Sequence, residues 1–235
     1  TVERISDPNF FETPEEGFQE IWKCFEYFNS VWEDRKANDQ GGGDLISMLA
    51  RGEATKNMSP NEFLGNVLLL IVAGNDTTRN SMSGGISALN KYPEQLAKVK
   101  SDQSLIPSMV SEIIRWQSPV AHMCRTAMED VELGGKLIKK WDKVAIWYVS
   151  GNRDTNKFPD PNQLVIDRSD VRQHLSFGFG IHRCLGNRLA ELQLKILWEE
   201  ILKRFSHIEI TGETQYLPSS FIRGITELPV IVHRH

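Results

Sequence analysis

Apolar residues recur along this chain mostly at the three- and four-residue spacing of amphipathic helices. The longest such pattern starts at residues 59–62, where Ser59 can cap a helix, Pro60 suits its first turn and Glu62 completes a capping box. No proline follows until Pro93, so the pattern predicts one helix of about 30 residues. The first half of this helix is apolar on nearly every side, which predicts that it is buried.

Shorter elements are predicted on both sides of this helix. Helical patterns cover residues 15–37, 44–50, 93–100 and 104–117, and a further one begins at 187. Strand patterns cover 131–138, as a hairpin with a Gly-Gly turn, and 143–148, 208–210 and 228–232. Irregular connections are predicted over 39–43, which is rich in glycine, and over 151–176. Together these elements predict a single domain over residues 1–235 of the α+β class, mainly α with small β-sheets.

Composition and charge narrow the class of protein. The 235 residues are 40% hydrophobic and 25% charged, as in ordinary soluble globular proteins, and the net charge of −4 gives no reason to expect nucleic-acid binding. Cys24, Cys124 and Cys184 lie far apart and form no CxxC pair, so a reducing cytoplasm is predicted rather than a disulfide framework. No signal peptide is recognised, and no apolar run reaches the roughly 20 residues that span a bilayer.

One cysteine lies on a glycine-rich loop directly before a helix. Residues 177–186 read Phe-Gly-Phe-Gly-Ile-His-Arg-Cys-Leu-Gly, and the helical pattern begins at Asn187. Free backbone N–H groups and the helix dipole at that end favour the thiolate of Cys184, and the glycines let the backbone approach a flat partner. A single cysteine suits haem iron better than zinc or an iron–sulfur cluster, which take about four protein ligands. The other interpretation is a structural cysteine buried in a glycine-rich turn.

Polar residues interrupt the long apolar helix at residues 73–78, which read Ala-Gly-Asn-Asp-Thr-Thr. A buried carboxylate such as Asp76 is costly unless it has a partner or a task. A threonine hydroxyl bonded to the carbonyl four residues earlier would loosen the helix and make room for water or a diatomic ligand. A polar kink or a helix–helix contact explains the same residues equally well.

Three motifs together resemble the cytochrome P-450 superfamily. The pattern Phe177-x-x-Gly180-x-x-x-Cys184-x-Gly186 resembles its haem-ligand signature, residues 73–78 resemble its oxygen-binding groove, and residues 112–115 resemble its structural ExxR motif. An acid and an arginine at i, i+3 are, taken alone, more often a weak surface pair. Further stretches resemble the soluble bacterial P-450 family that hydroxylates alkanes at the terminal carbon, namely 74–81, 147–154 and 174–184. The resemblance covers essentially the whole chain but only the C-terminal part of that family's fold.

The resemblance implies a fold and a set of site residues. The fold is the C-terminal portion of the P-450 fold, with the long distal helix and the haem-thiolate loop. Cys184 is implied as the axial ligand of haem b, and Asp76 with Thr77 as the relay of protons to iron-bound dioxygen. The remaining residues are implied to surround the haem (Phe177, Gly178, His182, Arg125), to contact the substrate (Ala73, Gly74, Val120, Ala121, Phe221) or to form a structural network behind the haem (Glu112, Arg115, Arg168).

The implied activity is that of a haem-thiolate monooxygenase, which inserts one oxygen atom of O2 into an unactivated C–H bond, here the terminal carbon of medium-chain alkanes. No flavin or iron–sulfur domain is recognised, so a ferredoxin and its NAD(P)H-dependent reductase are implied as electron donors. Fatty acids, fatty alcohols or terpenes are alternative substrates, and a non-catalytic haem sensor or electron carrier is an alternative of another class.

Two further expectations come with the resemblance. Because only part of the fold is expected, the polypeptide alone is predicted to be poorly soluble or to bind haem weakly. Related sequences usually have a glycine at the position of Trp141, so the turn there is expected to differ from theirs.

Overall fold

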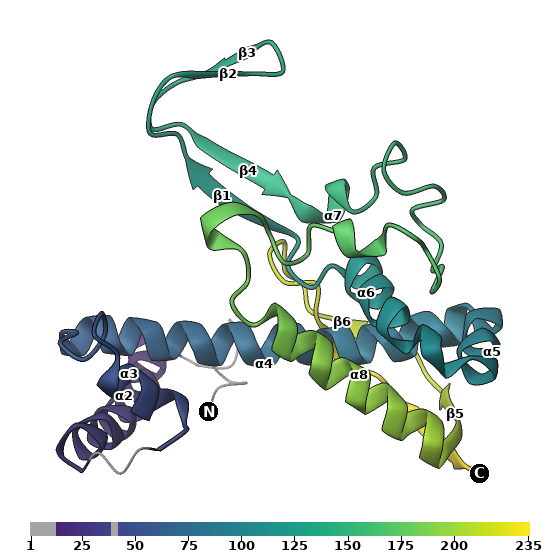
Figure 1. Ribbon diagram of the computed structural model, residues 1–235, viewed down its shortest axis with the longest axis horizontal. Coiled ribbons are helices and arrows are strands. Elements are labelled where there is room, and N and C mark those ends of the chain that lie inside the picture. Colours follow the sequence, from purple (N-terminus) through teal and green to yellow (C-terminus); the bar gives the residue numbers. More distant parts are fainter. Residues whose placement is uncertain (1–12, 39–41) are drawn as a thin grey trace. The chain divides into compact units, whose positions relative to one another are not determined.

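The computed structural model describes residues 13–38 and 42–235, so the predicted connection over 39–43 lies largely outside the described residues. Helices and short antiparallel sheets make up the described chain, which confirms the predicted mainly α class with small sheets (Figure 1). The chain divides into two compact units, residues 1–76 and 77–235. The boundary falls inside the long helix α4, Pro60–Lys91, directly after Asp76. A single domain over the whole chain stays a prediction.

The first unit contains α2 (Pro14–Ala37), α3 (Leu45–Arg51) and the first part of α4. The predicted capping box is present at the start of α4. The Glu62 N–H donates to the Ser59 hydroxyl at 3.3 Å, and the Ser59 N–H donates to the Glu62 carboxylate at 2.8 Å. These bonds satisfy N–H groups that a helix N-terminus leaves unpaired. The side chains of Thr13 and Asp44 cap the other two helices, so all three starts follow from the local sequence.

The first half of α4 is less buried than its composition predicts. Phe63 and Val67 lie in one core cluster with Trp32 of α2 and Ala50 of α3. Leu69, by contrast, remains 66% exposed. The prediction of burial on all sides is wrong, because α2 and α3 cover one face of the helix and no other described element of this unit covers the rest.

Helix α4 remains α-helical throughout residues 73–78, so the predicted local loosening is not found. One hydrogen bond of the expected kind is present just beyond, where the Ser81 hydroxyl donates to the Thr77 carbonyl at 2.9 Å. The helix accommodates this extra bond without a break.

The second unit is built around the end of α4 and further helices. These are α5 (Pro93–Ser101), α6 (Ile106–Gln117), α7 (Tyr148–Gly151) and α8 (Asn187–Arg204), with 3-10 turns at Gln103–Leu105, Val171–Gln173 and Gly180–His182. Its core joins Leu89 of α4, Ile113 of α6, Trp198 of α8 and Ile166 of the irregular segment. None of the described helices is both long enough and apolar enough to cross a membrane.

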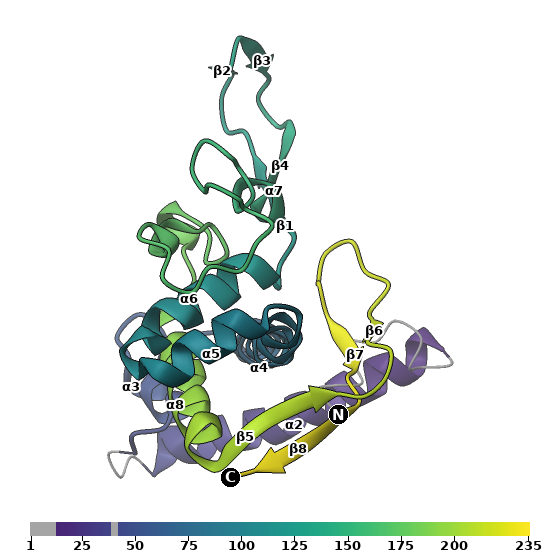
Figure 2. The same cartoon turned by 90° about the vertical axis from the view of Figure 1, so that its right-hand side faces the viewer.

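Short strands pair in antiparallel hairpins and ladders. The pairs are β1 (His122–Thr126) with β4 (Lys143–Trp147), β2 (Val131–Leu133) with β3 (Lys136–Ile138), β5 (Phe205–Ile210) with β8 (Val230–Arg234), and β6 (Gln215–Tyr216) with β7 (Ile225–Glu227). The β2–β3 hairpin continues beyond the end of the β1–β4 pair (Figures 1 and 2). Strand β1 is not anticipated by the sequence. The predicted strand over 143–148 ends one residue early, because Tyr148 already belongs to α7.

The turn before β4 has unusual backbone geometry at Trp141. Its φ is +75°, in the left-handed region that favours glycine. The Asp142 N–H donates to the Lys139 carbonyl at 3.0 Å, which closes a β-turn with Trp141 at its third position. A positive φ at that position is the requirement of a type II turn, so the side chain of Trp141 causes strain there. The expected difference from related sequences stays a prediction.

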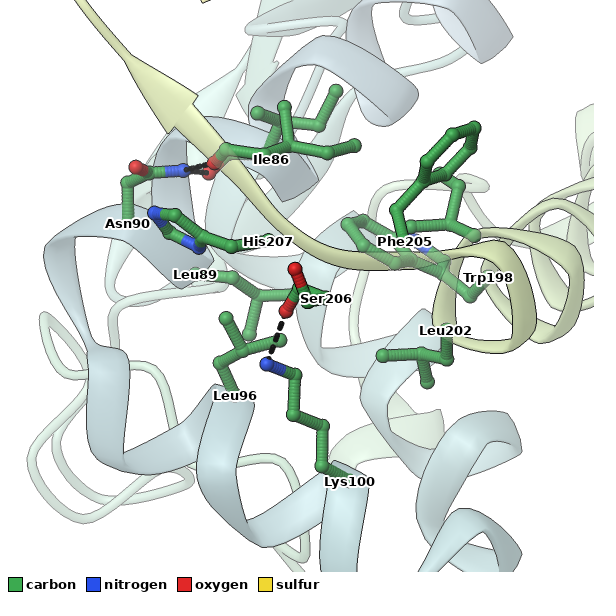
Figure 3. Close-up of a pocket in the computed structure, with 12 residues that line it drawn as sticks. Ile86, Leu89, Asn90, Leu96, Lys100, Trp198, Leu202, Phe205, Ser206 and His207 are labelled. Atoms are coloured by element: carbon green, nitrogen blue, oxygen red, sulfur yellow. Dashed lines mark hydrogen bonds between the residues drawn. The ribbon is translucent and has the colours of Figure 1, made fainter. Parts of the chain in front are cut away.

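Polar side chains of α4 and α5 form hydrogen bonds with β5 around a small apolar pocket (Figure 3). Asn90 of α4 donates to the carbonyls of Ile86 at 3.0 Å and Ile208 at 2.9 Å. Lys100 of α5 donates to the Ser206 carbonyl. These bonds fix the sheet edge against the ends of α4 and α5.

Candidate functional site

Helix α6 carries a fully buried ion pair. Glu112 and Arg115 lie one turn apart, and Arg115 donates to the Glu112 carboxylate from Nε at 2.7 Å and from Nη2 at 2.8 Å. Both side chains are 0% exposed. Charges that lose their hydration in this way need further hydrogen bonds to be tolerated.

The irregular segment 151–176 supplies those hydrogen bonds. Arg115 donates, at 2.7–3.1 Å, to the backbone carbonyls of Asn152, Pro161 and Gln163. Glu112 accepts the Val165 N–H at 2.9 Å and the Arg168 Nε–H at 3.4 Å. The structure therefore brings Glu112, Arg115 and Arg168 into one network, as the resemblance implies. Their role in haem retention stays a prediction.

The cysteine loop is closed at its base. The Cys184 N–H donates to the Phe177 carbonyl at 2.8 Å. Gly178 and Gly180 have φ values of +67° and +74°, which glycine adopts without strain. A Cβ on Gly178 would also lie only 3.1 Å from the Tyr148 hydroxyl. Both the backbone angle and the close approach to α7 explain a glycine at this position.

The tip of the same loop is open. Cys184 is a free cysteine and is exposed, and His182 two residues earlier is exposed as well. Nearby apolar side chains are almost fully exposed, at 82% for Phe179, 98% for Ile181 and 89% for Leu185. Helix α8 begins at Asn187, directly after this loop (Figure 1). A free thiol is thus presented among apolar side chains that no described part of the protein covers.

Asn152 is a buried polar residue that sequence reasoning did not single out. Its side-chain amide donates to the hydroxyls of Ser118 and Ser176, both at 2.8 Å, and its Oδ1 accepts the Leu175 N–H at 2.6 Å. It therefore ties the end of α6 to the segment that leads into the cysteine loop. The polar run Gly-Asn-Arg-Asp at 151–154, directly after an apolar strand pattern, was the available signal.

His174 lies in the segment that leads into the loop and is 8% exposed. The Ser176 N–H donates to its Nδ1 at 3.2 Å, and its ring centroid lies 5.2 Å from that of Phe177. Burial, followed by the positive charges of Arg115 and Arg183, lowers the pKa of His174 to about 4. The imidazole is therefore neutral at pH 7 and can accept the backbone hydrogen bond.

Two segments far apart in the sequence bring three predicted substrate contacts together. The Ala121 N–H donates to the Phe221 carbonyl at 2.8 Å, and Val120 forms an antiparallel β-bridge with Ile222. Ala121 is buried, whereas the Phe221 side chain is 41% exposed and packs edge-on against the ring of His122 at 5.9 Å. The contact of these residues with a substrate stays a prediction.

Arg125 lies on β1 and is partly exposed. Its guanidinium donates to the carbonyl of Cys124 at 3.0 Å and forms no ion pair with any carboxylate of the described residues. Its charge is therefore available to a carboxylate of a bound group. His122 lies on the same strand. Its Nδ1 is buried and has no hydrogen-bond partner among the described residues, and its ring centroid lies 4.6 Å from that of Trp147. Within the described residues no cluster of three or more His, Cys, Asp or Glu side chains is suited to a metal ion.

Four predicted site residues lie on α4. Asp76 is only 6% exposed although it carries a carboxylate, and Thr77 is partly buried. Ala73 and Gly74 are exposed, and a Cβ on Gly74 would meet no atom within 4 Å. Ala73, Gly74 and Asp76 belong to the first unit and Thr77 to the second. Their roles at the substrate and in proton transfer stay predictions.

Comparison with known proteins establishes the family. The model of the cytochrome P-450 family matches residues 8–227. The chain belongs to the cytochrome P-450 family. Proteins of this family bind haem b through a cysteine thiolate, and the predicted resemblance and the predicted fold are thereby confirmed.

Relatives of the P-450 family match nearly all of this chain but only part of their own length. Linalool 8-monooxygenase of Pseudomonas putida is 38% identical over 227 residues, which are 96% of this chain and 55% of that protein. A methyl-branched lipid omega-hydroxylase of Mycobacterium tuberculosis is 39% identical over 229 residues, which are 96% of this chain and 53% of that protein. The chain spans about half the length of these curated relatives.

A solved P-450 structure has the same fold over the same part. Cytochrome P-450 153 from Novosphingobium aromaticivorans has a TM-score of 0.91 and 45% sequence identity. The match covers 99% of this chain and 57% of that chain. Because identity is this high, the agreement extends to family membership as well as to fold.

The described residues fit the haem of a P-450. Haem is a flat apolar ring with one metal position for a protein thiolate and with two carboxylates. The cysteine loop offers one exposed thiol and several uncovered apolar side chains, and Arg125 and His182 offer donors for carboxylates. Zinc and iron–sulfur sites take about four protein ligands, and the described residues contain no group of three or more His, Cys, Asp or Glu side chains suited to a metal ion.

Proposed function

We propose that this chain forms the haem-binding, catalytic portion of a monooxygenase that hydroxylates the terminal carbon of medium-chain alkanes. The observation that carries the proposal is the exposed thiol of Cys184, held on a loop of uncovered apolar side chains in a chain of the P-450 family. Similarity to a methyl-branched lipid omega-hydroxylase supports attack at a chain end. In this proposal the thiolate of Cys184 would hold the iron of haem b.

The residues of this chain hold the cofactor from several sides. Bound haem would supply the activation of dioxygen, helped by the electron density that a thiolate ligand donates. Cys184 supplies that thiolate, and the backbone of Phe177 and Gly178 keeps the loop in the geometry described above. Arg125 and His182 bind the carboxylates of the haem through charge-assisted hydrogen bonds. The network of buried charges on α6 holds the segment that leads into the loop.

Asp76 and Thr77, both on α4, form a proton relay in this proposal. In this proposal the Thr77 hydroxyl would donate protons for the activation of dioxygen, and the Asp76 carboxyl would resupply them. Asp76 is only 6% exposed, which supports a role in which its carboxyl transfers protons away from bulk solvent. Ala73 and Gly74 are small enough to leave space beside them for oxygen and substrate.

The substrate is recognised by apolar shape. An alkane has no polar group to hold, and each methylene discriminates by only about 1–3 kcal/mol. Backbone contacts hold Val120, Ala121 and Phe221 close together, and in this proposal they position the chain end. Fatty acids, fatty alcohols and terpenes are the alternative substrates, and the relative that oxidises linalool favours the last of them.

Electrons come from a separate protein in this proposal. We infer a ferredoxin with its NAD(P)H-dependent reductase, because exposed Arg183 and Arg188 flank the cysteine and suit an acidic partner. The described cysteines are all free, which supports a reducing cytoplasm as the compartment.

The carbon monoxide difference spectrum of the reduced protein tests the ligand. The protein is expressed at its full natural length with haem supplied, beside a Cys184→Ala variant. A red-shifted Soret band that is lost in the variant is expected, because only a thiolate ligand produces that shift. A band at the ordinary imidazole-type position would overturn the assignment of Cys184.

Product analysis tests the activity. The same protein is given n-octane, dodecanoic acid and linalool with a ferredoxin and its reductase, and octan-1-ol is the expected product. Thr77→Ala should consume oxygen at a similar rate while octan-1-ol falls by about tenfold or more, because proton delivery contributes factors of that size. A red-shifted band without any oxidised product would favour the sensor or electron carrier.

A further inference from the structure

The end of α6 is joined to the loop between β6 and β7 by a reciprocal pair of hydrogen bonds. Arg223 Nη1 donates to the Gln117 carbonyl at 2.6 Å, and Gln117 Nε2 donates to the Arg223 carbonyl at 2.9 Å. The Arg223 N–H also donates to the Pro119 carbonyl at 2.8 Å. Gln117 is only 5% exposed, so its carboxamide is held in one place. We call these three bonds the Gln117–Arg223 clasp.

The clasp lies directly beside the predicted substrate contacts. Two residues after Pro119, the Ala121 N–H donates to the Phe221 carbonyl at 2.8 Å. Two residues before Arg223, Phe221 extends its ring to the partly exposed side of this small ladder. The clasp therefore fixes which residue of the loop faces Ala121, because in a ladder of this kind a slip of one residue turns each side chain to the other face.

A second arginine makes the equivalent contact, and within the described residues it forms no hydrogen bond with the loop between β6 and β7. Arg153 Nη2 donates to the Trp116 carbonyl at 2.9 Å, one residue before the carbonyl that Arg223 binds. Both guanidinium groups satisfy carbonyls that the end of a helix leaves unpaired. Burial lowers the pKa of each. A comparison of the two arginines separates capping of α6 from positioning of the loop, because both arginines cap α6 and only Arg223 belongs to the loop that carries Phe221.

We propose that Gln117 and Arg223 are positioning residues that determine substrate selectivity by holding Phe221 in register with Val120 and Ala121. The inference rests on the proposed function, because it takes these three residues as the substrate surface. Neither Gln117 nor Arg223 needs to touch the substrate. Their effect passes through the backbone of the ladder, and a displacement of about 1 Å at such a position is enough to change reactivity substantially.

The test compares Arg223→Gln with the matched control Arg153→Gln in the haem-loaded protein. Each variant loses one arginine bond to the end of α6, so the two should lose similar stability. Arg223→Gln is expected to lower the ratio of octan-1-ol to octan-2-ol by about tenfold, the size expected for a misplaced apolar contact. Arg153→Gln is expected to leave that ratio unchanged. Arg223→Lys should restore part of it, because the lysine can still donate one bond to the Gln117 carbonyl.

A readout that needs no turnover accompanies the products. Amide hydrogen exchange at Ala121 and Arg223 should speed up in Arg223→Gln and not in Arg153→Gln, because these N–H groups belong to the ladder. If Arg223→Gln fails to bind haem, Gln117→Met provides the second variant. It keeps the length of a buried side chain and removes only the donor to the Arg223 carbonyl.

The outcomes separate this inference from the proposed function. Equal product ratios and equal exchange in both arginine variants, with normal haem binding, would overturn the positioning role and leave the monooxygenase intact. Loss of the red-shifted carbon monoxide band in the unaltered protein would instead overturn the proposed function. A changed product ratio in Arg223→Gln and Gln117→Met alone would establish the clasp as a determinant of selectivity.

Discussion

Arg115 donates hydrogen bonds from two nitrogens to the carboxylate of Glu112, at 2.7 and 2.8 Å, and neither side chain is exposed to solvent. One turn of α6 therefore holds a complete ion pair inside the second unit. Around it, carbonyls of the irregular segment 151–176 accept the remaining donors of Arg115. Arg115 is thus one of the residues that hold this mostly irregular segment to α6.

Glu112→Gln should destabilise the protein by about 3–5 kcal/mol, because it leaves a buried guanidinium without its counter-charge. Urea unfolding at pH 7 measures the change. The matched control is Glu199→Gln, which breaks an exposed pair with Lys195 (3.2 Å) and should cost less than about 1 kcal/mol. Similar losses of unfolding free energy in both variants would show that the buried α6 pair contributes no more to stability than an exposed pair.

His174 should make stability depend on pH. Its pKa is about 4 in the folded protein and 6.5 in the reference state, so the unfolded chain binds more protons at acidic pH. The stabilisation is complete above pH 6.5 and is lost as the pH falls toward 4. Between pH 8 and pH 5 this group should lower the free energy of unfolding by about 2 kcal/mol.

Urea unfolding at several pH values tests this dependence on His174. His174→Asn keeps an acceptor for the Ser176 N–H and removes the titrating ring, so the slope between pH 7 and pH 5 should flatten. His233→Asn, at an exposed position on β8, provides the control. An unchanged slope in His174→Asn would contradict the prediction.

Trp141→Gly should stabilise the protein by about 1 kcal/mol, because glycine adopts the φ of +75° without the strain of a side chain. The ring itself contributes little, since Trp141 is 61% exposed and its neighbour in the turn is the ammonium of Lys140 at 5.2 Å. Trp141→Ala removes the same ring and keeps the strain. Thermal unfolding should therefore rank the glycine variant above both the alanine variant and the natural protein.

Gly85→Ala should destabilise the second unit by about 1–3 kcal/mol through overpacking. A Cβ there would lie 2.8 Å from Cζ2 of Trp198 and 3.1 Å from Cδ1 of Ile113, both of which are buried. Gly65→Ala, on the same helix with nothing within 4 Å, should instead stabilise by about 0.5–1 kcal/mol. Opposite signs in denaturant midpoints are expected, and two stabilising results would show that Trp198 can move aside.

Helix starts and chain turns follow closely from the sequence. The capping box at Ser59 and Glu62 needs only residues three apart, and the Gly-Gly turn of the β2–β3 hairpin needs only two residues that tolerate positive φ. The prediction that the first half of α4 is buried on all sides is wrong, as the exposed Leu69 shows, because the apolar composition of a helix does not say how many of its faces a neighbour covers. Strand β1 is missed because its residues, His-Met-Cys-Arg-Thr, have no period-two pattern.

The sequence by itself determined the cysteine loop, the long helix and the family, because these depend on motifs whose residues are close together in the chain. Tertiary structure decided which residues, far apart in the chain, form hydrogen bonds around those motifs. The partners of Arg115, the buried amide of Asn152 and the clasp between Gln117 and Arg223 join residues tens of positions apart. Hydrogen bonds of that kind leave no periodicity in a sequence, since each depends on the folded path of the backbone that supplies the carbonyl.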